Sequence, residues 1–186
     1  MIDDVVVAGP MIILAGLTSM RTVGSRVAEI LMGHSITACL VGRITYDEIQ
    51  RIEDEAKKTG VVLIIAVGGG RVIDTAKVVS YNLDIQFVSV PTAASHDGIA
   101  SSRASVVTDS GNVRIAAQPP LAIVADTGSI ATAPHRLLAA GCADIIANYT
   151  AILDWELSHR LTGETISEYA LTLSKITAEI LVNNTD

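Results

Sequence analysis

The sequence predicts an α/β fold with a mainly parallel sheet. Residues 61–67 form an unbroken apolar run, mostly β-branched, that leads into three glycines at 68–70 and then into a helix-like segment. A continuous apolar run bounded by glycines is typical of a strand buried on both faces. A second short apolar run, 87–90, leads into a loop of small and polar residues at 91–102. Strands that alternate with helices predict parallel pairing, with both loops at one edge of the sheet.

Ahead of this central stretch, the pattern predicts two strands and two helices. The predicted elements are a strand at 11–15, a helix at 26–32, a strand at 36–41 and a helix at 46–58. The first strand is an apolar run that ends at Gly16. In the second helix Ile49 and Ile52 recur at helical spacing among charges that we expect to face solvent, and Gly60 is expected to end it. A short apolar run at 5–7 precedes them.

Beyond the glycines, the sequence predicts a hairpin and a helical C-terminal part. The predicted elements are a helix at 72–80, hairpin strands at 104–108 and 112–116, a buried strand at 121–124, and helices at 134–139, 144–161 and 166–182. Asp109, Ser110 and Gly111 form the hairpin turn. Pro134 suits a helix start, and Gly163 suits a helix end. We therefore predict a nucleotide-binding domain at 1–130 and the beginning of a helical metal and substrate domain at 131–186.

Composition limits the function classes. The chain has 186 residues, a formal net charge of −7 and a sequence pI near 5.0, which oppose a nucleic-acid-binding surface. No apolar run approaches the roughly 18 to 20 residues of a membrane span, and no basic segment precedes an apolar core at the N-terminus. We expect a cytoplasmic protein without nucleic acid as a partner and without a membrane span; a homo-oligomer is left open.

The glycine turn is the first candidate binding element. Glycines allow backbone angles that a Cβ would forbid and let main-chain N–H groups approach a ligand closely. A helix that opens near Arg71 would direct its unpaired N–H groups and positive dipole end at the same space, which suits a pyrophosphate. The alternative is a tight strand-to-helix turn that binds nothing. The second loop, rich in small residues and hydroxyls, favours a nucleotide groove.

Three runs of sequence resemble one enzyme family. They are GGGRVIDTAK at 68–77, SVPTAASHDGIASSRAS at 89–105 and AGCADIIANYTAILDWELSHR at 140–160. The sequence resembles the archaeal glycerol-1-phosphate dehydrogenases, which belong with the glycerol dehydrogenases, dehydroquinate synthases and iron-containing alcohol dehydrogenases. The resemblance implies a Rossmann-like nucleotide domain followed by a helical domain, with NAD(P)(H) and Zn²⁺ as cofactors. It also implies one more strand and helix ahead of Ile12, and a longer helical domain than 131–186.

The resemblance assigns roles to particular residues. It implies that the coenzyme contacts are Gly68, Gly69, Gly70, Arg71, Val72, Ile73, Asp74, Thr92, Ala93, Ala94, Ser95 and Ser101. Asp97 would contact substrate, and Asp144 would bind both the metal and substrate, which makes these two the catalytic candidates. From the residues alone, Asp74 is better explained as a helix-start cap than as a phosphate contact. Thr92 and Ser95 would also suit an ordinary turn.

One carboxylate does not make a zinc site. A catalytic zinc needs about three protein ligands with one position open, and the resemblance implies that two histidines come from the later helical domain. If one helix carried Asp144 through His159, the two would lie about 22 Å apart. His34 and His135 have surface-like contexts, whereas His96 lies beside Asp97 inside the loop at 91–102, which we call the signature loop, and is a candidate for a direct role.

The implied reaction is reversible reduction of dihydroxyacetone phosphate to sn-glycerol 1-phosphate by NAD(P)H, for the ether-lipid backbone. Three alternatives stay open: a glycerol dehydrogenase, a dehydroquinate-synthase-like enzyme, and a nucleotide-binding module without turnover. The SHDG sequence at 95–98 argues against the first. The missing metal ligands favour the last.

Overall fold

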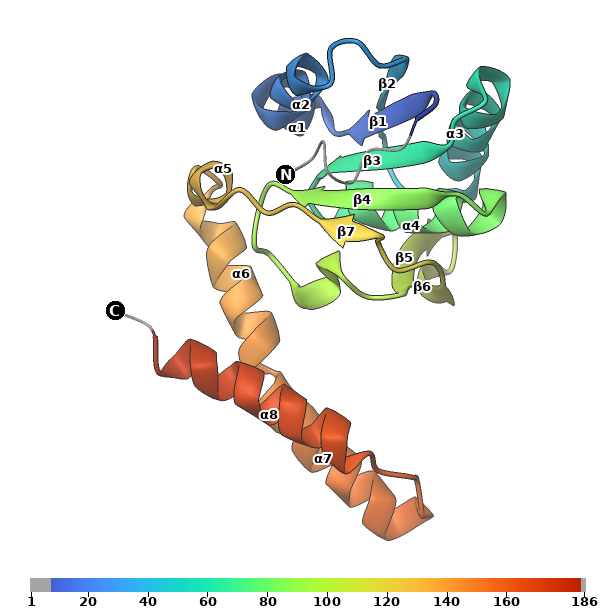
Figure 1. Cartoon of the computed structure of the whole chain (residues 1–186). Coiled ribbons are helices and arrows are strands. Elements are labelled where there is room, and N and C mark those ends of the chain that lie inside the picture. Colours follow the sequence, from blue (N-terminus) through green and yellow to red (C-terminus); the bar gives the residue numbers. More distant parts are fainter. Residues whose placement is uncertain (1–7, 185–186) are drawn as a thin grey trace. The chain divides into compact units, whose positions relative to one another are not determined.

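The computed structural model describes residues 8–184, so the apolar run at 5–7 lies outside the described part. It confirms the α/β fold, with a five-stranded parallel sheet in the order β2-β1-β3-β4-β7 (Figure 1). The strands are β1 (Met11–Ala15), β2 (Ile36–Leu40), β3 (Leu63–Gly68), β4 (Gln86–Pro91) and β7 (Ala122–Ile123). The described residues form two compact units, one of 8–94 with 98–133, the other of 95–97 with 134–184.

The direction in which the chain adds strands to the sheet reverses after β2, although all five strands are parallel. From β1 the chain crosses to β2 at one edge of the sheet, and then returns to β3 on the other side of β1. Open α/β sheets bind ligands outside the carboxyl ends of the strands at such a reversal. The loops that follow β1 and β3 therefore flank the expected binding crevice.

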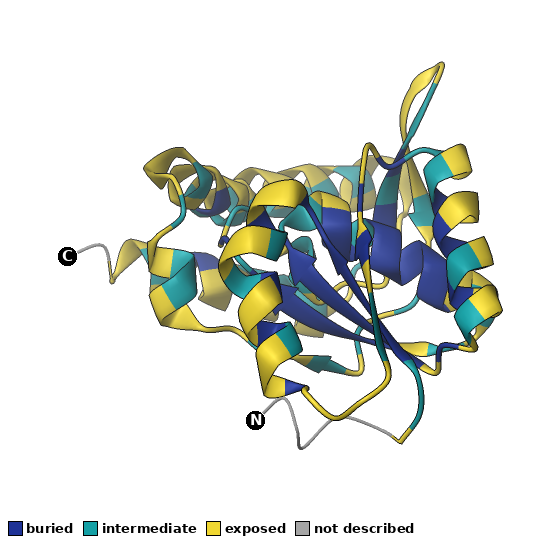
Figure 2. Ribbon diagram, turned by 90° about the horizontal axis from the view of Figure 1, so that it is seen from above, coloured by how far each residue is buried: buried dark blue, intermediate teal, exposed yellow. Residues whose placement is uncertain are grey.

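Alternate residues of the strands build two apolar layers, as the apolar runs predict. On one face Ile12 and Ile64 pack with α3 (Tyr46–Thr59) and α4 (Gly70–Leu83). On the other, Ile13 and Ile65 pack with α2 (Ser25–Ile30), which follows the short helix α1 (Leu17–Ser19) and a π-helical segment, η1 (Met20–Gly24). Figure 2 shows the buried residues concentrated in these strands and in α4.

The predicted helix boundaries around α3 are confirmed. Thr45 is the N-cap, and its hydroxyl accepts from the Glu48 N–H at 3.3 Å. Gly60 ends the helix in the left-handed conformation, with φ of 64°. The predicted solvent-facing charges are largely exposed, but Glu53 is buried because its carboxylate accepts from Asn82 at 2.6 Å.

The predicted hairpin is also confirmed. Strands β5 (Arg103–Thr108) and β6 (Gly111–Ala116) pair in antiparallel fashion around Asp109 and Ser110. The prediction for 121–124 is wrong in extent and in burial. There β7 has two residues, pairs only with Val88 and Ser89, and leaves Ile123 41% exposed, because it is an edge strand.

Several boundaries of the C-terminal helices differ from the prediction. The helices are α6 (His135–Ile146), α7 (Asn148–Thr162) and α8 (Glu168–Val182), and a short helix α5 (Thr127–Ala131) was not predicted. We predicted a break between 139 and 144, but Gly141 lies buried inside α6 and the break falls at Ala147. A single glycine inside a helix is tolerated, and here it misleads. Gly163 ends α7 as predicted, with φ of 73°.

These helices carry many exposed apolar side chains. Leu153 is 63% exposed and Leu161 75% exposed. The 28-residue stretch His135–Thr162 is long and apolar enough to cross a membrane. The expectation of no membrane span stays a prediction.

Candidate functional site

The glycine turn connects the end of β3 to the start of α4. A Cβ built on Gly68 would lie 2.7 Å from Val72 Cγ2 and 2.9 Å from Val72 Cβ, so only glycine fits where the helix packs on the strand. Gly69 is the helix N-cap, and a Cβ built there would have no heavy atom of the described residues within 4 Å, apart from its two chain neighbours. The two glycines therefore have different roles, because Gly68 permits close packing whereas Gly69 borders open space.

The start of α4 suits an anion. The helix has no side-chain cap at Gly69 and no acidic residue in its first turn. Its N-terminal amides and positive dipole end are consequently available to a negatively charged ligand. The Arg71 guanidinium adds a cation to the first turn and lies 3.3 Å from the position of a Cβ on Gly16. A pyrophosphate is the kind of group that this arrangement binds.

The loop after β1 is tied to the end of β3. The buried Ser19 hydroxyl donates to the Val67 carbonyl at 2.8 Å and accepts from the Gly16 N–H at 2.9 Å. These bonds fix the two loops that flank the reversal in the sheet. We did not single out Ser19 from the sequence; a serine three residues after the glycine that ends a strand is the signal that could have found it.

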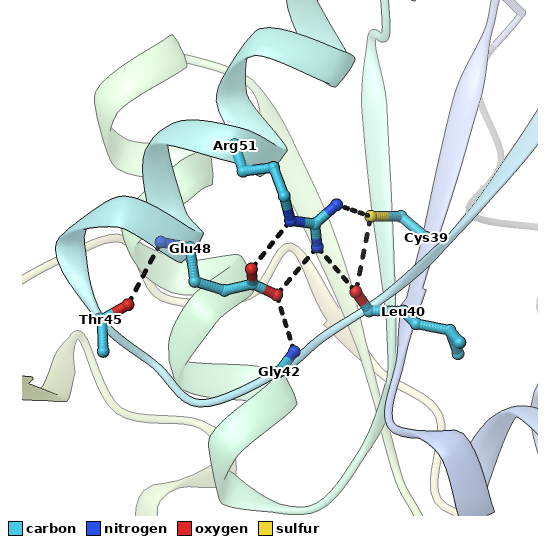
Figure 3. A network of polar contacts seen from close by, with 6 residues as sticks. All are labelled: Cys39, Leu40, Gly42, Thr45, Glu48 and Arg51. Atoms are coloured by element: carbon cyan, nitrogen blue, oxygen red, sulfur yellow. Dashed lines mark hydrogen bonds and ion pairs between the residues drawn. The ribbon is translucent and has the colours of Figure 1, made fainter.

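A polar network lies at the carboxyl end of β2 (Figure 3). Arg51 donates to both carboxylate oxygens of Glu48, each at 2.8 Å, and also to the Leu40 carbonyl at 2.8 Å. The Gly42 N–H donates to Glu48 at 2.7 Å. The Arg51 guanidinium lowers the pKa of the Glu48 carboxyl, while partial burial acts in the opposite direction. The network holds the loop after β2 in place. The Glu48 carboxylate is paired with Arg51 in this network.

The second predicted loop adjoins the glycine turn. The Thr92 N–H donates to the Gly68 carbonyl at 3.1 Å, and Gly68 lies opposite Pro91 in the sheet. Ala93 is buried and Ala94 is exposed, whereas Ser95 belongs to the other compact unit. The structure thus brings Thr92 beside the glycines, at the sheet edge expected from parallel pairing.

Other predicted coenzyme residues face elsewhere. The side chains of Val72 and Ile73 are 3% and 0% exposed and belong to the core, so only their backbone could face a ligand. Asp74 is not the helix-start cap that we expected, because its carboxylate accepts from Lys77 at 2.9 Å and from the Ser105 N–H at 3.0 Å. Ser101 is exposed, and its hydroxyl accepts from Lys77 at 3.2 Å.

The substrate and metal candidates meet in the second unit. The Asp97 N–H donates to Asp144 Oδ2 at 2.9 Å. Among residues 8–184 no group of three or more His, Cys, Asp or Glu side chains could hold a metal ion. His159 lies on α7, where its Nδ1 is 2.6 Å from the Glu164 carbonyl oxygen, and His135 is exposed at the start of α6. Among the described residues, Asp144 is therefore not part of a group of three such side chains that could hold a metal ion.

The fold and the sequence define the class of protein. Residues 6–134 match the iron-containing alcohol dehydrogenase family, a match that spans well over half of the sequence. The chain therefore belongs to the iron-containing alcohol dehydrogenase family.

Within this family, the chain is similar to curated glycerol-1-phosphate dehydrogenases. The chain is 66% identical over 185 residues to the glycerol-1-phosphate dehydrogenase (NAD(P)+) of Methanocorpusculum labreanum, covering 100% of this chain and 51% of the relative. It is 48% identical over 185 residues to the enzyme of the same name from Methanosarcina mazei, covering 98% of this chain and 52% of the relative. The chain spans about half the length of the curated relatives that it matches. The resemblance noted from the three sequence runs is confirmed.

Solved structures agree on the fold. A probable glycerol dehydrogenase from Sinorhizobium meliloti superposes with a TM-score of 0.81 at 23% identity, over 96% of this chain and 50% of that one. NADH-dependent butanol dehydrogenase A from Thermotoga maritima gives a TM-score of 0.74 at 18% identity, over 95% and 49%. At these identities the likeness supports the fold alone.

Proposed function

We propose that this chain binds a nicotinamide coenzyme, NAD(P)(H), at the crevice between the loops after β1 and β3. The observation that carries the proposal is the uncapped start of α4 at the reversal in the strand order, beside Gly69. The pyrophosphate would accept hydrogen bonds from the amides of residues 69–71, with Arg71 as a counter-charge. Thr92 lies on the adjacent loop, where its N–H donates to the Gly68 carbonyl.

The proposed reaction is that named for the curated relatives. A protein of this kind would transfer a hydride between NAD(P)H and the ketone of dihydroxyacetone phosphate, giving sn-glycerol 1-phosphate for lipid biosynthesis. Identities of 66% and 48% to glycerol-1-phosphate dehydrogenases favour this reaction over those of a glycerol dehydrogenase or a dehydroquinate synthase. We propose a cytoplasmic enzyme, in which the domains 1–130 and 131–186 bind coenzyme and substrate respectively.

Asp97 and Asp144 are the proposed catalytic and substrate residues. Asp144 accepts the Asp97 N–H, so the signature loop and α6 are held together at this point. Zinc would supply a Lewis acid that polarises the ketone, and Asp144 is its proposed ligand. However, a catalytic zinc needs about three protein ligands, and residues 8–184 offer no such group. The described residues therefore do not fit a complete zinc site, and we derive no step through the metal.

A coenzyme-binding chain without turnover is the second candidate, and it is favoured by the lack of a group of three metal ligands among residues 8–184. The experiment that separates the two candidates combines NADH fluorescence titration with NADH oxidation in the presence of dihydroxyacetone phosphate and Zn²⁺. We expect saturable NADH binding and no oxidation by this chain. Oxidation together with stoichiometric zinc would overturn our placement of the metal site. Absence of NADH binding by the folded chain would overturn the coenzyme proposal itself.

A further inference from the structure

The most unusual polar group of the sheet-containing unit is the ammonium of Lys77. This side chain lies in the middle of α4 and is 0% exposed, although lysine is almost never fully buried without a partner. It is not one of the residues predicted to bind coenzyme. Isolated burial of such a charge would be very costly, so its partners indicate what it does.

Four oxygen atoms surround the Lys77 Nζ. They belong to the Asp74 carboxylate at 2.9 Å, the Gly98 carbonyl at 2.5 Å, the Arg103 carbonyl at 2.8 Å and the Ser101 hydroxyl at 3.2 Å. We call these five residues the Lys77 cluster. An ammonium has three N–H donors, so all of them are used. Hydrogen bonds from a charged donor are stronger than neutral ones.

Three of the four acceptors come from one stretch of chain. Gly98 and Ser101 lie in the loop at 91–102, and Arg103 is the first residue of β5; they come 21, 24 and 26 residues after Lys77. Gly98 directly follows Asp97, the proposed substrate residue, and Ser101 is a proposed coenzyme residue. The stretch 98–102 contains only the end of a short 3₁₀ turn, η2 (Asp97–Ile99), and the bonds from Lys77 connect it to α4.

Asp74 extends the same connection to the hairpin. Its second carboxylate oxygen accepts the Ser105 N–H at 3.0 Å, while the first accepts from Lys77. The ion pair on one face of α4 thus contacts both the loop and the first strand after it. An i, i+3 pair on an exposed helix face contributes only a few tenths of a kcal/mol, whereas this pair is enclosed, and removal of one partner would leave an unpaired buried charge.

We propose that Lys77 is a positioning residue that holds residues 98–103 in the conformation required for coenzyme binding. This inference rests on the proposed function, and it assigns to α4 a second role besides presenting its N-terminus. Lys77 acts through Gly98, Ser101 and Arg103 and does not itself contact the coenzyme. Loss of the Lys77 charge should therefore increase local opening of residues 98–103 more than local opening of the parallel sheet.

The test compares Lys77→Met with Lys58→Met, which removes an exposed lysine of α3. Amide hydrogen exchange is measured for residues 98–105 and for β3, and NADH affinity is measured by fluorescence titration. In Lys77→Met we expect exchange of residues 98–105 to rise about tenfold or more while β3 changes little, with NADH affinity reduced about three- to tenfold. Lys58→Met should match the wild type. Unchanged exchange at 98–105, or an equal rise in β3, would overturn the inference.

Two further variants keep the test decisive if Lys77→Met does not fold. Ser101→Ala removes one acceptor of the ammonium and leaves the ion pair intact; it should raise exchange in the same residues by a smaller factor. Asp74→Asn with Lys77→Met removes both charges, so it should fold better than Lys77→Met alone. If the wild type binds no NADH but residues 98–105 loosen selectively in Lys77→Met, the proposed function fails together with the coenzyme part of this inference, and only the ordering of the loop by Lys77 stands. If NADH binds and neither variant changes exchange there, the positioning role fails alone.

Discussion

Gly68→Ala should destabilise the chain because of one local contact. The added methyl would lie 2.7 Å from Val72 Cγ2 and 2.9 Å from Val72 Cβ. A rotamer change can move Cγ2, but the Cβ moves only with the backbone of α4. Overpacking of this kind costs about 1 to 3 kcal/mol. Replacing glycine in the unfolded chain returns about 0.4 to 1 kcal/mol, so we expect a net loss of about 1 to 2 kcal/mol.

Gly69→Ala is the matched control one residue away. A Cβ there has no heavy atom within 4 Å, and the backbone is extended with φ of −86°. Alanine is a poorer N-cap than glycine, while the unfolded-state gain acts in the opposite direction. We expect the two effects to cancel within about 0.5 kcal/mol. The same position should matter for ligand binding, because the open space is where a pyrophosphate would approach.

The assay is thermal and urea unfolding of both variants, followed by NADH titration of the folded proteins. For a chain of this length each kcal/mol shifts the melting temperature by about 2 to 4 °C, so Gly68→Ala should melt about 2 to 8 °C lower. Gly69→Val should bind NADH about tenfold more weakly or worse. If Gly68→Ala and Gly69→Ala unfold alike, the packing argument is wrong. If Gly69→Val is folded and binds normally, the turn is not the pyrophosphate site.

Three further predictions concern other contacts. Glu48→Gln should lose about 0.5 to 1 kcal/mol of unfolding free energy at pH 7. Because Arg51 lowers the pKa of Glu48, this contribution is present above about pH 4.3 and is lost as the pH falls through the lowered pKa, so the difference in urea unfolding between variant and wild type should shrink as the pH is lowered below about 4.3. Thr45→Ala removes the N-cap of α3 and should cost about 1 kcal/mol of unfolding free energy, whereas Thr45→Ser should cost much less. Asp144→Asn keeps an acceptor for the Asp97 N–H and should preserve exchange protection of that amide, whereas Asp144→Ala should lose it.

Much of the fold could be predicted because the signals are local. The apolar run that becomes β3, the amphipathic pattern of α3 and the turn of the β5–β6 hairpin each depend on residues close together in sequence. The prediction for the edge strand β7 is too long because the four apolar residues 121–124 do not indicate how many of them pair with a neighbouring strand. The break at Ala147 was missed because no residue there interrupts the helical pattern, whereas Gly141 does.

The candidate site could be predicted only in part. The strand, glycine and helix order located the turn, but it could not tell that Gly68 packs against Val72 while Gly69 borders open space. The partners of Asp74 are 3 and 31 residues away, and the more distant one comes from a strand. Ser19 contacts Val67, 48 residues later. Such long-range contacts follow from the sheet order, which the sequence pattern alone did not determine.

The proposed function requires that a nicotinamide coenzyme binds in the crevice between the loops after β1 and β3. The most direct measurement is the change in backbone amide chemical shifts when NADH is titrated into the isotope-labelled chain. We expect saturable shifts that are largest at residues 68–71 and at Thr92, with Gly69→Val abolishing them. Saturable shifts centred elsewhere on the chain, or none at NADH concentrations of about 1 mM, would contradict it.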